Sequence, residues 1–427
     1  MFKSSKKIII SGAIGNALEM YDYVIWGLFA AFLSAEFLPP NSSLSDIFFL
    51  FFITYILRPI GGFLGGMLAD QAGRKRVLTL SILLMGIGTA AIGILPSYEQ
   101  IGVTSVFLLL FIRLVQVISV SNEYISSVSL LIESCEKQKK GYFGSWAAFG
   151  VNAGMLISSL TGTLILYLID RHILPPWGWR LAFVFAFVTM LLGFWIRNSI
   201  PESQEFIANH ARSNTRSLSD IFFETAHVLK QYLLESLVVF MLVLFGTTTT
   251  VLIFVYAPSH MIKVNNFTST QAFMINSAGL AIVTALIPTM GRLSDAYGRI
   301  RVISTGIVTL TLFITPHFLS LTSGTFSQVL WSHCLMAVPC AAIFAVIPVF
   351  ITDIFPHSVR CSSANLIYSV ASCVGGGAMP WVAVKLSEHY HLSTAYILVL
   401  YGVLTFIMLT HLVKRKTLQK YELSVID

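Results

Sequence analysis

Among the charged side chains within the long apolar stretches of this chain, five are candidates for chemistry at membrane depth. Glu19 and Asp22 interrupt the first stretch, Arg58 falls in the second, and Arg113 and Glu123 fall in the fourth. An ionisable group at membrane depth costs at least ~2.5–3.5 kcal/mol on insertion scales, so such groups are functional candidates. The chemistry open to them is proton transfer and the binding of carboxylates.

The carboxylates and the arginines suit different tasks. Glu19 and Asp22 are three residues apart and therefore share one face of a helix. Burial favours a neutral carboxyl and a nearby arginine favours the ionised form, so either residue can carry a proton between two environments. Arg113 keeps its charge and can bind a substrate or coupling carboxylate through two hydrogen bonds, and Glu123 is the expected inner gate. A static buried salt network is the structural alternative, above all for Arg58, which precedes a proline.

The elements that must position these charges are predicted to be membrane helices. The chain has 427 residues, of which 56% are hydrophobic and only 11% are charged, and its mean hydropathy is +0.78. A soluble protein carries about 25% charged residues, so a soluble enzyme is excluded, as is a disordered chain. Twelve apolar runs are long enough to cross a bilayer. They cover 8–37, 46–69, 77–95, 101–132, 141–169 and 179–197, then 231–257, 268–291, 302–321, 325–352, 361–384 and 393–413.

The runs fall into two sets of six around a polar stretch. We expect an all-α membrane protein with six-helix halves at 1–197 and 231–427, joined by a cytoplasmic linker at 198–230. With both termini inside, 21 of the 27 Lys and Arg residues lie on the cytoplasmic side, as the positive-inside rule requires. The formal charge of +7 therefore reflects topology in a cell inner or plasma membrane, and no nucleic-acid partner is expected.

An internal repeat supports the two halves. Residues 66–77 read GMLADQAGRKRV and residues 291–302 read GRLSDAYGRIRV, each after the second span of its half. A second pair, an acidic residue followed seven positions later by a basic one, recurs at the inner end of each fourth span. Glycine permits the tight reversal in each loop. A turn at the headgroups is one interpretation, and a latch between the halves is the other. The candidate latch residues are Asp70, Gly73, Arg74, Asp295, Gly298, Arg299, Glu133, Asp353 and Arg360.

These loops resemble the signature of the major facilitator superfamily. Further segments resemble its metabolite–proton symporter family, which includes carriers of proline/betaine, 2-oxoglutarate, citrate and shikimate. They are GNALEMYDY at 15–23, RPIGG at 58–62, WGWR at 177–180, IPES at 200–203 and IFPHSVR at 354–360. The resemblance implies that helices 1, 4, 7 and 10 line a central cavity, with Glu19, Asp22, Arg113 and Glu123 around it. The chain departs from the family where glycines are replaced in VISVSNE at 117–123.

Aromatic side chains within the apolar runs are candidates for the cavity wall. Tyr23, Trp26, Tyr256 and Tyr368 could hold a quaternary ammonium group by cation–π attraction, although lipid or core packing is the alternative for each. The Gly-x-x-x-Gly spacing at Gly150 and Gly154 predicts close helix packing.

Together these features predict a transporter that works by alternating access. The expected activity is proton-coupled uptake of a small carboxylated or zwitterionic solute such as proline or betaine. A di- or tricarboxylate symporter for 2-oxoglutarate or citrate is the first alternative, and a drug/proton antiporter is the second. The sequence has no nucleophile–base pair, metal cluster or nucleotide motif of diagnostic spacing, so we expect no enzyme activity, no cofactor, no metal and no obligate protein partner. The expected partners are the solute, protons and the bilayer.

Overall fold

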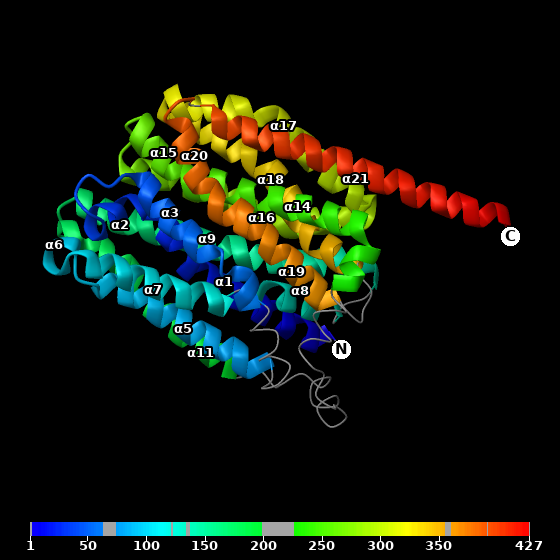
Figure 1. The fold of residues 1–427 in the computed structure, drawn as a ribbon, viewed down its shortest axis with the longest axis horizontal. Coiled ribbons are helices and arrows are strands. Elements are labelled where there is room, and N and C mark those ends of the chain that lie inside the picture. Colours follow the sequence, from blue (N-terminus) through cyan, green and yellow to red (C-terminus); the bar gives the residue numbers. More distant parts are fainter. Residues whose placement is uncertain are drawn as a thin grey trace.

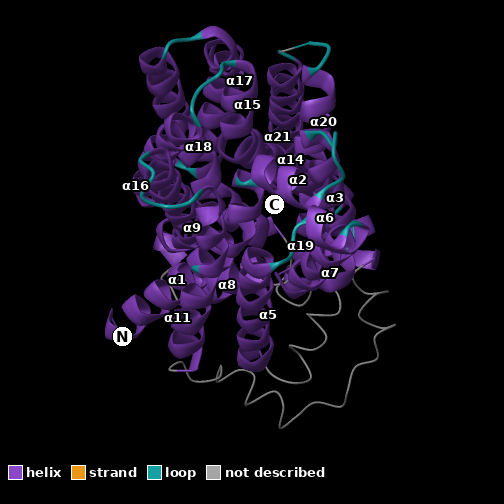
Figure 2. Cartoon of the chain, turned by 90° about the vertical axis from the view of Figure 1, so that its left-hand side faces the viewer, coloured by secondary structure: helices purple, strands orange, loops and turns teal. Residues whose placement is uncertain are grey.

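The computed structural model describes residues 2–62, 74–120, 123–133, 137–198, 226–354, 360–390 and 392–426. Within these ranges the regular structure is helical and contains no strand (Figure 2). Nine helical segments of the described chain are long and apolar enough to cross a bilayer, and Thr79–Ile94 and Val103–Ser119 are shorter apolar helices. With the first helix, these make twelve membrane-spanning segments among the described residues. The prediction of an all-α, twelve-helix membrane fold is confirmed.

The helices follow the predicted order of spans. In the first set they are α1 (Phe2–Leu28), α2 (Ala30–Phe37), α3 (Leu44–Tyr55), α5 (Arg74–Ile94), α6 (Tyr98–Ile101), α7 (Val103–Val120), α8 (Glu123–Glu133), α9 (Lys140–Asp170), α10 (Leu181–Val184) and α11 (Ala186–Asn198). In the second set they are α14 (Leu233–Val251), α15 (Ala257–Val264), α16 (Ser269–Tyr297), α17 (Arg299–Ser323), α18 (Phe326–Ile354), α19 (Arg360–Ser372), α20 (Met379–Ser387) and α21 (Ser393–Ile426). The fourth predicted span consists of α7 and α8, and residues 199–225 of the predicted linker lie outside the described part.

The two sets of helices lie beside each other. Helices of the first set, coloured blue to cyan, gather in the lower part of Figure 1, whereas yellow to red helices lie above them. Both termini are at the same end of the molecule, opposite α2, α6 and α15 (Figure 1). The contact between the sets is dominated by α9 and α16, which pack against each other. Thr270 donates a hydrogen bond of 2.6 Å to Asp170, and Ser277 donates one of 2.8 Å to Ser159 near mid-length.

Glycines allow α1 and α9 to approach closely. A Cβ atom at Gly150 would collide with the Ala13 carbonyl group, and one at Gly154 would collide with that of Ala17. The close packing predicted from the Gly-x-x-x-Gly spacing is therefore confirmed. It fixes the orientation of α1 about its axis, and thereby decides which neighbours its polar residues meet.

Two short π-helical segments interrupt spans of the second set. They are η3 (Leu252–Tyr256), between α14 and α15, and η4 (Cys373–Ala378), between α19 and α20. Such widened turns occur frequently at functional sites. The glycines of η4 lie against α3, where a Cβ atom at Gly377 would come within 2.6 Å of Tyr55 Cβ. This approach places Tyr55 at the boundary between the two sets.

Candidate functional site

A small central cavity lies between the two sets of helices. Its volume is about 60 Å³, room for a few water molecules. Its wall comes from α8 and α9 of the first set and from α14, α18 and α19 of the second. The polar and aromatic residues of this wall are Tyr124, Asn152, Thr247, Thr250, Phe344 and Tyr368. Tyr368, a candidate for the cavity wall, is one of the lining residues.

A chain of aromatic rings and guanidinium groups leads away from this cavity. Tyr368 stacks on Tyr124 with 5.1 Å between ring centroids. On its other side, Arg58 Cζ lies 5.6 Å from the Tyr368 ring and 5.3 Å from the Tyr55 ring. Arg58 Nη1 also donates a 3.2 Å hydrogen bond to the Tyr55 hydroxyl. Arg58 therefore links the first set of helices to a cavity residue of the second set.

This series of aromatic rings and guanidinium groups ends at Arg113, whose side chain is 1% exposed. Three rings surround its guanidinium group, with Cζ at 4.9 Å from the Trp26 ring, 5.1 Å from Phe51 and 5.4 Å from Tyr23. Its Nη1 donates a 2.9 Å hydrogen bond to Gln116 Oε1. The structure thus brings together Arg113, Tyr23 and Trp26, which the sequence analysis had named separately. We call Tyr23, Trp26, Phe51, Tyr55, Arg58 and Arg113 the arginine–aromatic cluster.

Several buried donors of this cluster lack an acceptor among the described residues. They are Nε and Nη2 of Arg113, the hydroxyl group of Tyr23 and Nε1 of Trp26. A buried donor without an acceptor costs about 1–3 kcal/mol, and more when it is charged. Cation–π contacts recover part of the cost of burying a guanidinium group, but they leave the N–H groups unsatisfied. The surroundings of Arg113 are therefore suited to an added hydrogen-bond acceptor, and best to an anionic one.

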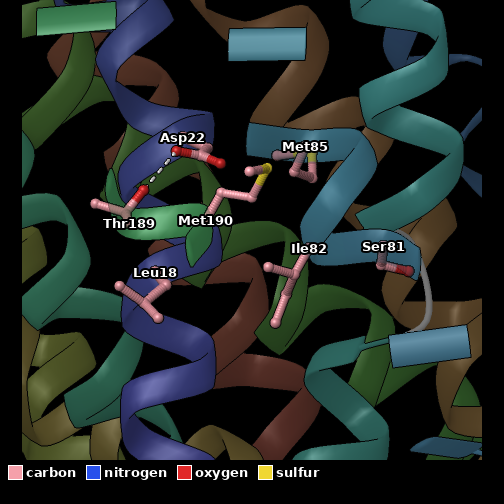
Figure 3. A pocket seen from close by; sticks show the side chains of 7 residues that line it. All are labelled: Leu18, Asp22, Ser81, Ile82, Met85, Thr189 and Met190. Atoms are coloured by element: carbon pink, nitrogen blue, oxygen red, sulfur yellow. Dashed lines mark hydrogen bonds between the residues drawn. The ribbon is translucent and has the colours of Figure 1, made fainter. Parts of the chain in front are cut away.

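Asp22 occupies a different place from the one expected. The resemblance implied that it faces the central cavity, but it is 4% exposed in a small pocket between α1, α5 and α11 (Figure 3). There the Thr189 hydroxyl donates to Asp22 Oδ1 at 3.4 Å, beside the apolar side chains of Ile82 and Met85. Because successive helix residues differ by about 100° in direction, Asp22 and Tyr23 point to different neighbours.

The Asp22 pocket is nevertheless close to the arginine–aromatic cluster through α5. Gln116, which binds Arg113, donates from Nε2 to the Thr89 hydroxyl at 2.8 Å and to the Met85 carbonyl at 3.4 Å. Met85 also lines the pocket of Asp22. One helix, α5, therefore contacts both the buried carboxylate and the hydrogen-bonding partner of the buried arginine.

The remaining predicted residues lie away from the central cavity or outside the described residues. Tyr256 does not line the central cavity, since it lies in a separate pocket beside Ser387 at the end opposite the termini. Asp70 and Gly73 lie outside the described residues. The same holds for the side chains of Glu19, Glu123, Arg74, Glu133, Asp353 and Arg360.

The second copy of the repeated loop makes a contact between the two sets of helices. Asp295 Oδ1 accepts a 2.7 Å hydrogen bond from the Gly141 amide, and Oδ2 accepts one of 2.8 Å from Tyr142. Both amides belong to the first turn of α9, where backbone N–H groups lack helical partners and the helix dipole favours negative charge. Asp295 therefore binds a helix N-terminus of the other set of helices. Gly298 follows with φ of 93°, and Arg299 begins α17.

Tyr55 and Phe51 of the cluster, and Gln116 beside it, were not predicted from the sequence. Tyr55 and Gln116 each lie three positions from a buried arginine, the spacing that brings helix side chains together, so this spacing was a usable signal. Phe51 gave no such signal, because nothing in an apolar run distinguishes one phenylalanine from another.

The fold and the buried charges indicate the class of protein independently of any comparison with known proteins. Twelve spans in two sets, with a cavity between them and ionisable groups at membrane depth, are the features of a multi-pass secondary transporter. The Major Facilitator Superfamily profile matches residues 12–287 and, in a second alignment, 238–423. The chain belongs to this superfamily and is a membrane transporter rather than an enzyme.

Individual relatives agree with this assignment. The chain is 30% identical over 395 residues to the shikimate transporter of Escherichia coli, covering 90% of this chain and 89% of that protein. It is 27% identical over 392 residues to the proline/betaine transporter of the same organism, covering 90% and 78%. The solved structure of the E. coli xylose transporter in a partially occluded, inward-open conformation has a TM-score of 0.75 at 18% identity, covering 95% of this chain and 97% of that one. This last likeness concerns the fold alone.

Proposed function

We propose that this protein takes up a small zwitterionic solute such as proline or betaine together with protons. In this proposal Arg113 binds the solute carboxylate and the surrounding rings receive its cationic nitrogen. The names of the proline/betaine and shikimate relatives support a carboxylated solute. A cationic drug as substrate is disfavoured, because a buried arginine would repel it.

The observation that carries the proposal is the set of unsatisfied donors at Arg113. Two guanidinium nitrogens of Arg113, and the phenol and indole N–H groups of two rings that contact it, are buried without an acceptor among the described residues. A carboxylate would satisfy the guanidinium through two hydrogen bonds, which are stronger than neutral ones. The solute would therefore supply the acceptor that the described part of the chain does not provide.

The aromatic rings favour a solute that also carries a positive charge. In the described structure the Arg113 guanidinium occupies the faces of Trp26 and Phe51. An arriving carboxylate would draw the guanidinium toward itself, and the released ring faces would attract a quaternary or secondary ammonium group. A zwitterion supplies both charges in one molecule.

A dicarboxylate such as 2-oxoglutarate is the second candidate. The observation that favours it is the presence of two buried arginines, Arg58 and Arg113, in one arginine–aromatic cluster. Two guanidinium groups could bind the two ends of such a molecule. Citrate falls in the same class and is tested with it.

For proton coupling we assign the carrier role to Asp22 or Glu19. Asp22 is buried beside apolar side chains and accepts a hydrogen bond of 3.4 Å from Thr189. Movement of α5 would change the pocket of Asp22 and, at the same time, the hydrogen bond that Gln116 donates to the Met85 carbonyl. Protonation and solute binding would thereby be coupled. Glu123 retains its proposed role as an inner gate.

Alternating access in this proposal is a movement of residues 1–197 against residues 231–427, joined by a cytoplasmic linker at 198–230. Both termini lie in the cytoplasm, so the Asp295 contact closes the inner side. The latch comprises the two repeated loops and the acidic–basic pairs at the ends of the fourth spans. The protein resides in the cell inner or plasma membrane, and its partners are the solute, protons and lipid.

Uptake by purified protein in liposomes tests the proposal. Labelled proline, betaine, 2-oxoglutarate and citrate are offered with and without an inward proton gradient, and a protonophore serves as the coupling control. We expect gradient-dependent uptake of proline or betaine and its loss in Arg113→Gln. The matched control is Arg171→Gln, because Arg171 also lies over a ring, at 5.4 Å from Tyr167, but is exposed. Uptake of the dicarboxylates alone would select the second candidate, and uptake of no solute would contradict both.

A further inference from the structure

A larger pocket opens at the end of the molecule opposite the two termini. Its volume is about 350 Å³ and it shares no lining residue with the central cavity. It is formed by α15, by the end of α20 and by the first residue of α3, next to the π-helical segment η3. Figure 1 shows α15 and α20 at this end. We call it the distal pocket, and its lining residues are Leu44, Tyr256, Ser259, His260, Lys263, Val264, Val384, Ser387 and Glu388.

The floor of the distal pocket is an ordered polar chain. Tyr256 donates a 3.2 Å hydrogen bond to Ser387 Oγ, and Ser387 donates one of 2.9 Å to the Val384 carbonyl. His260 Nδ1 lies 3.1 Å from the Tyr256 oxygen, within hydrogen-bond distance. Tyr256 and His260 are each 2% exposed. The floor is therefore held in place by η3, α15 and α20 together.

The rim of the pocket carries two opposite charges. Lys263 lies three residues after His260 on α15, and Glu388 follows Ser387 at the end of α20. Both side chains are exposed. Among the described residues, the recorded ion pair is that of Arg180 with Glu36, and neither rim residue takes part in it. A positive and a negative group thus border one pocket from two different helices, and Tyr256 contributes to its floor.

We propose that the distal pocket recognises a small zwitterion. Lys263 would bind its carboxylate, and Glu388 with the Tyr256 ring would bind its cationic nitrogen. The inference rests on the proposed function, which it deepens by placing a first recognition site on the outer side. The paired charges also select the substrate class, because Glu388 repels a di- or tricarboxylate that lacks a cationic group. Such a site raises the local concentration of zwitterion at the entrance without taking part in the transport step.

The first test measures the concentration dependence of uptake in liposomes. For Lys263→Gln and for Glu388→Gln we expect KM for labelled proline or betaine to rise about tenfold, the change expected when one hydrogen bond to a charged group is lost. The maximal rate should stay unchanged. The controls are Lys385→Gln and Glu99→Gln, which remove exposed charges of the same types outside the pocket. An unchanged KM in both rim variants, in a protein that transports the zwitterion, would overturn the inference.

A charge exchange separates recognition from a merely structural role. Lys263→Glu alone should raise KM further than Lys263→Gln, and Lys263→Glu combined with Glu388→Lys should recover part of the loss, because a zwitterion can bind in the reverse direction. No recovery in a folded, monodisperse double variant would count against paired charge recognition.

Direct binding distinguishes failure of this inference from failure of the proposed function. Equilibrium dialysis with labelled proline and labelled betaine is carried out on Arg113→Gln, in which we expect transport to be lost, and on the same protein with Lys263→Gln added. Binding that Lys263→Gln removes supports the distal pocket, even if the wild-type protein transports neither solute. The absence of binding to Arg113→Gln would overturn it.

Discussion

Removal of the Asp295 side chain should open the contact between the two sets of helices at the end near the termini. In the structure this carboxylate binds two backbone amides of α9, those of Gly141 and Tyr142, at 2.7 and 2.8 Å. Arg292 lies over the Tyr142 ring at 4.5 Å, so the contact includes a second cross-set interaction. Asp295→Ala removes the first and leaves the second in place.

The size of the effect follows from the two hydrogen bonds and their position. Replacement of a helix N-cap by alanine costs about 0.5–2 kcal/mol, and a charge near a partly buried helix end contributes up to ~2 kcal/mol. These contributions overlap, so about 2 kcal/mol is a reasonable value. At 1.4 kcal/mol for each factor of ten, the equilibrium between closed and open arrangements should shift by about thirtyfold.

Distance measurement between spin labels reports this equilibrium directly. Labels at Gln138 and Tyr297 lie on exposed positions of the two sets near the Asp295 contact, in a protein whose native cysteines have been replaced. We expect Asp295→Ala to enlarge the long-distance population. The matched control is Asp46→Ala, because Asp46 also binds a backbone amide, that of Ser43 at 2.7 Å, but within its own helix start.

Two results would refute this reasoning. One is an unchanged distance distribution in Asp295→Ala, which would mean that the contact does not hold the two sets together. The other is an equal shift in Asp295→Ala and Asp46→Ala, which would mean that general loosening, and not the cross-set contact, controls the equilibrium.

Three further predictions concern the buried charges and the packing of α1. Arg113→Lys keeps the charge but loses the bidentate geometry, so uptake should fall at least about tenfold; wild-type uptake would contradict carboxylate binding at Arg113. Asp22→Asn should abolish gradient-driven accumulation while solute exchange across liposomes persists, and full accumulation would remove Asp22 from proton transfer. Gly154→Val forces a side chain against the Ala17 carbonyl, which should lower the free energy of unfolding by about 1–3 kcal/mol and reduce the melting temperature in detergent; the control is Gly102→Ala, whose Cβ meets no neighbour but whose φ of 59° gives only backbone strain.

The membrane class and the order of spans could be predicted because they depend on local composition. Apolar runs of sufficient length between polar turns do not remain in water. In lipid each run satisfies its backbone hydrogen bonds by forming a helix. The spacing of Gly150 and Gly154 is also a local feature, so it could be recognised in the sequence as that of a packing face. Gly298 could likewise be recognised as part of a turn, which the structure confirms with a positive φ.

For the candidate site, the sequence indicates which charged residues belong to it but not which residues contact them. The cost of burying Arg113 identifies it from the sequence alone, but its three surrounding rings come from α1 and α3, far away along the chain. Asp22 shows the opposite case. Its burial was predicted, whereas its orientation toward α5 and α11 depends on how close packing against α9 rotates α1.

The sequence by itself determined that the chain spans a membrane, that it repeats, and that charges lie within its apolar spans, because each of these is a property of neighbouring residues. Only the tertiary structure decided that Arg113 meets aromatic rings and Gln116, that Asp22 lies apart from the central cavity, and that Asp295 binds a helix N-terminus. The physical reason is that a helix presents its side chains in all directions, and the packing of helices against one another selects which of them meet.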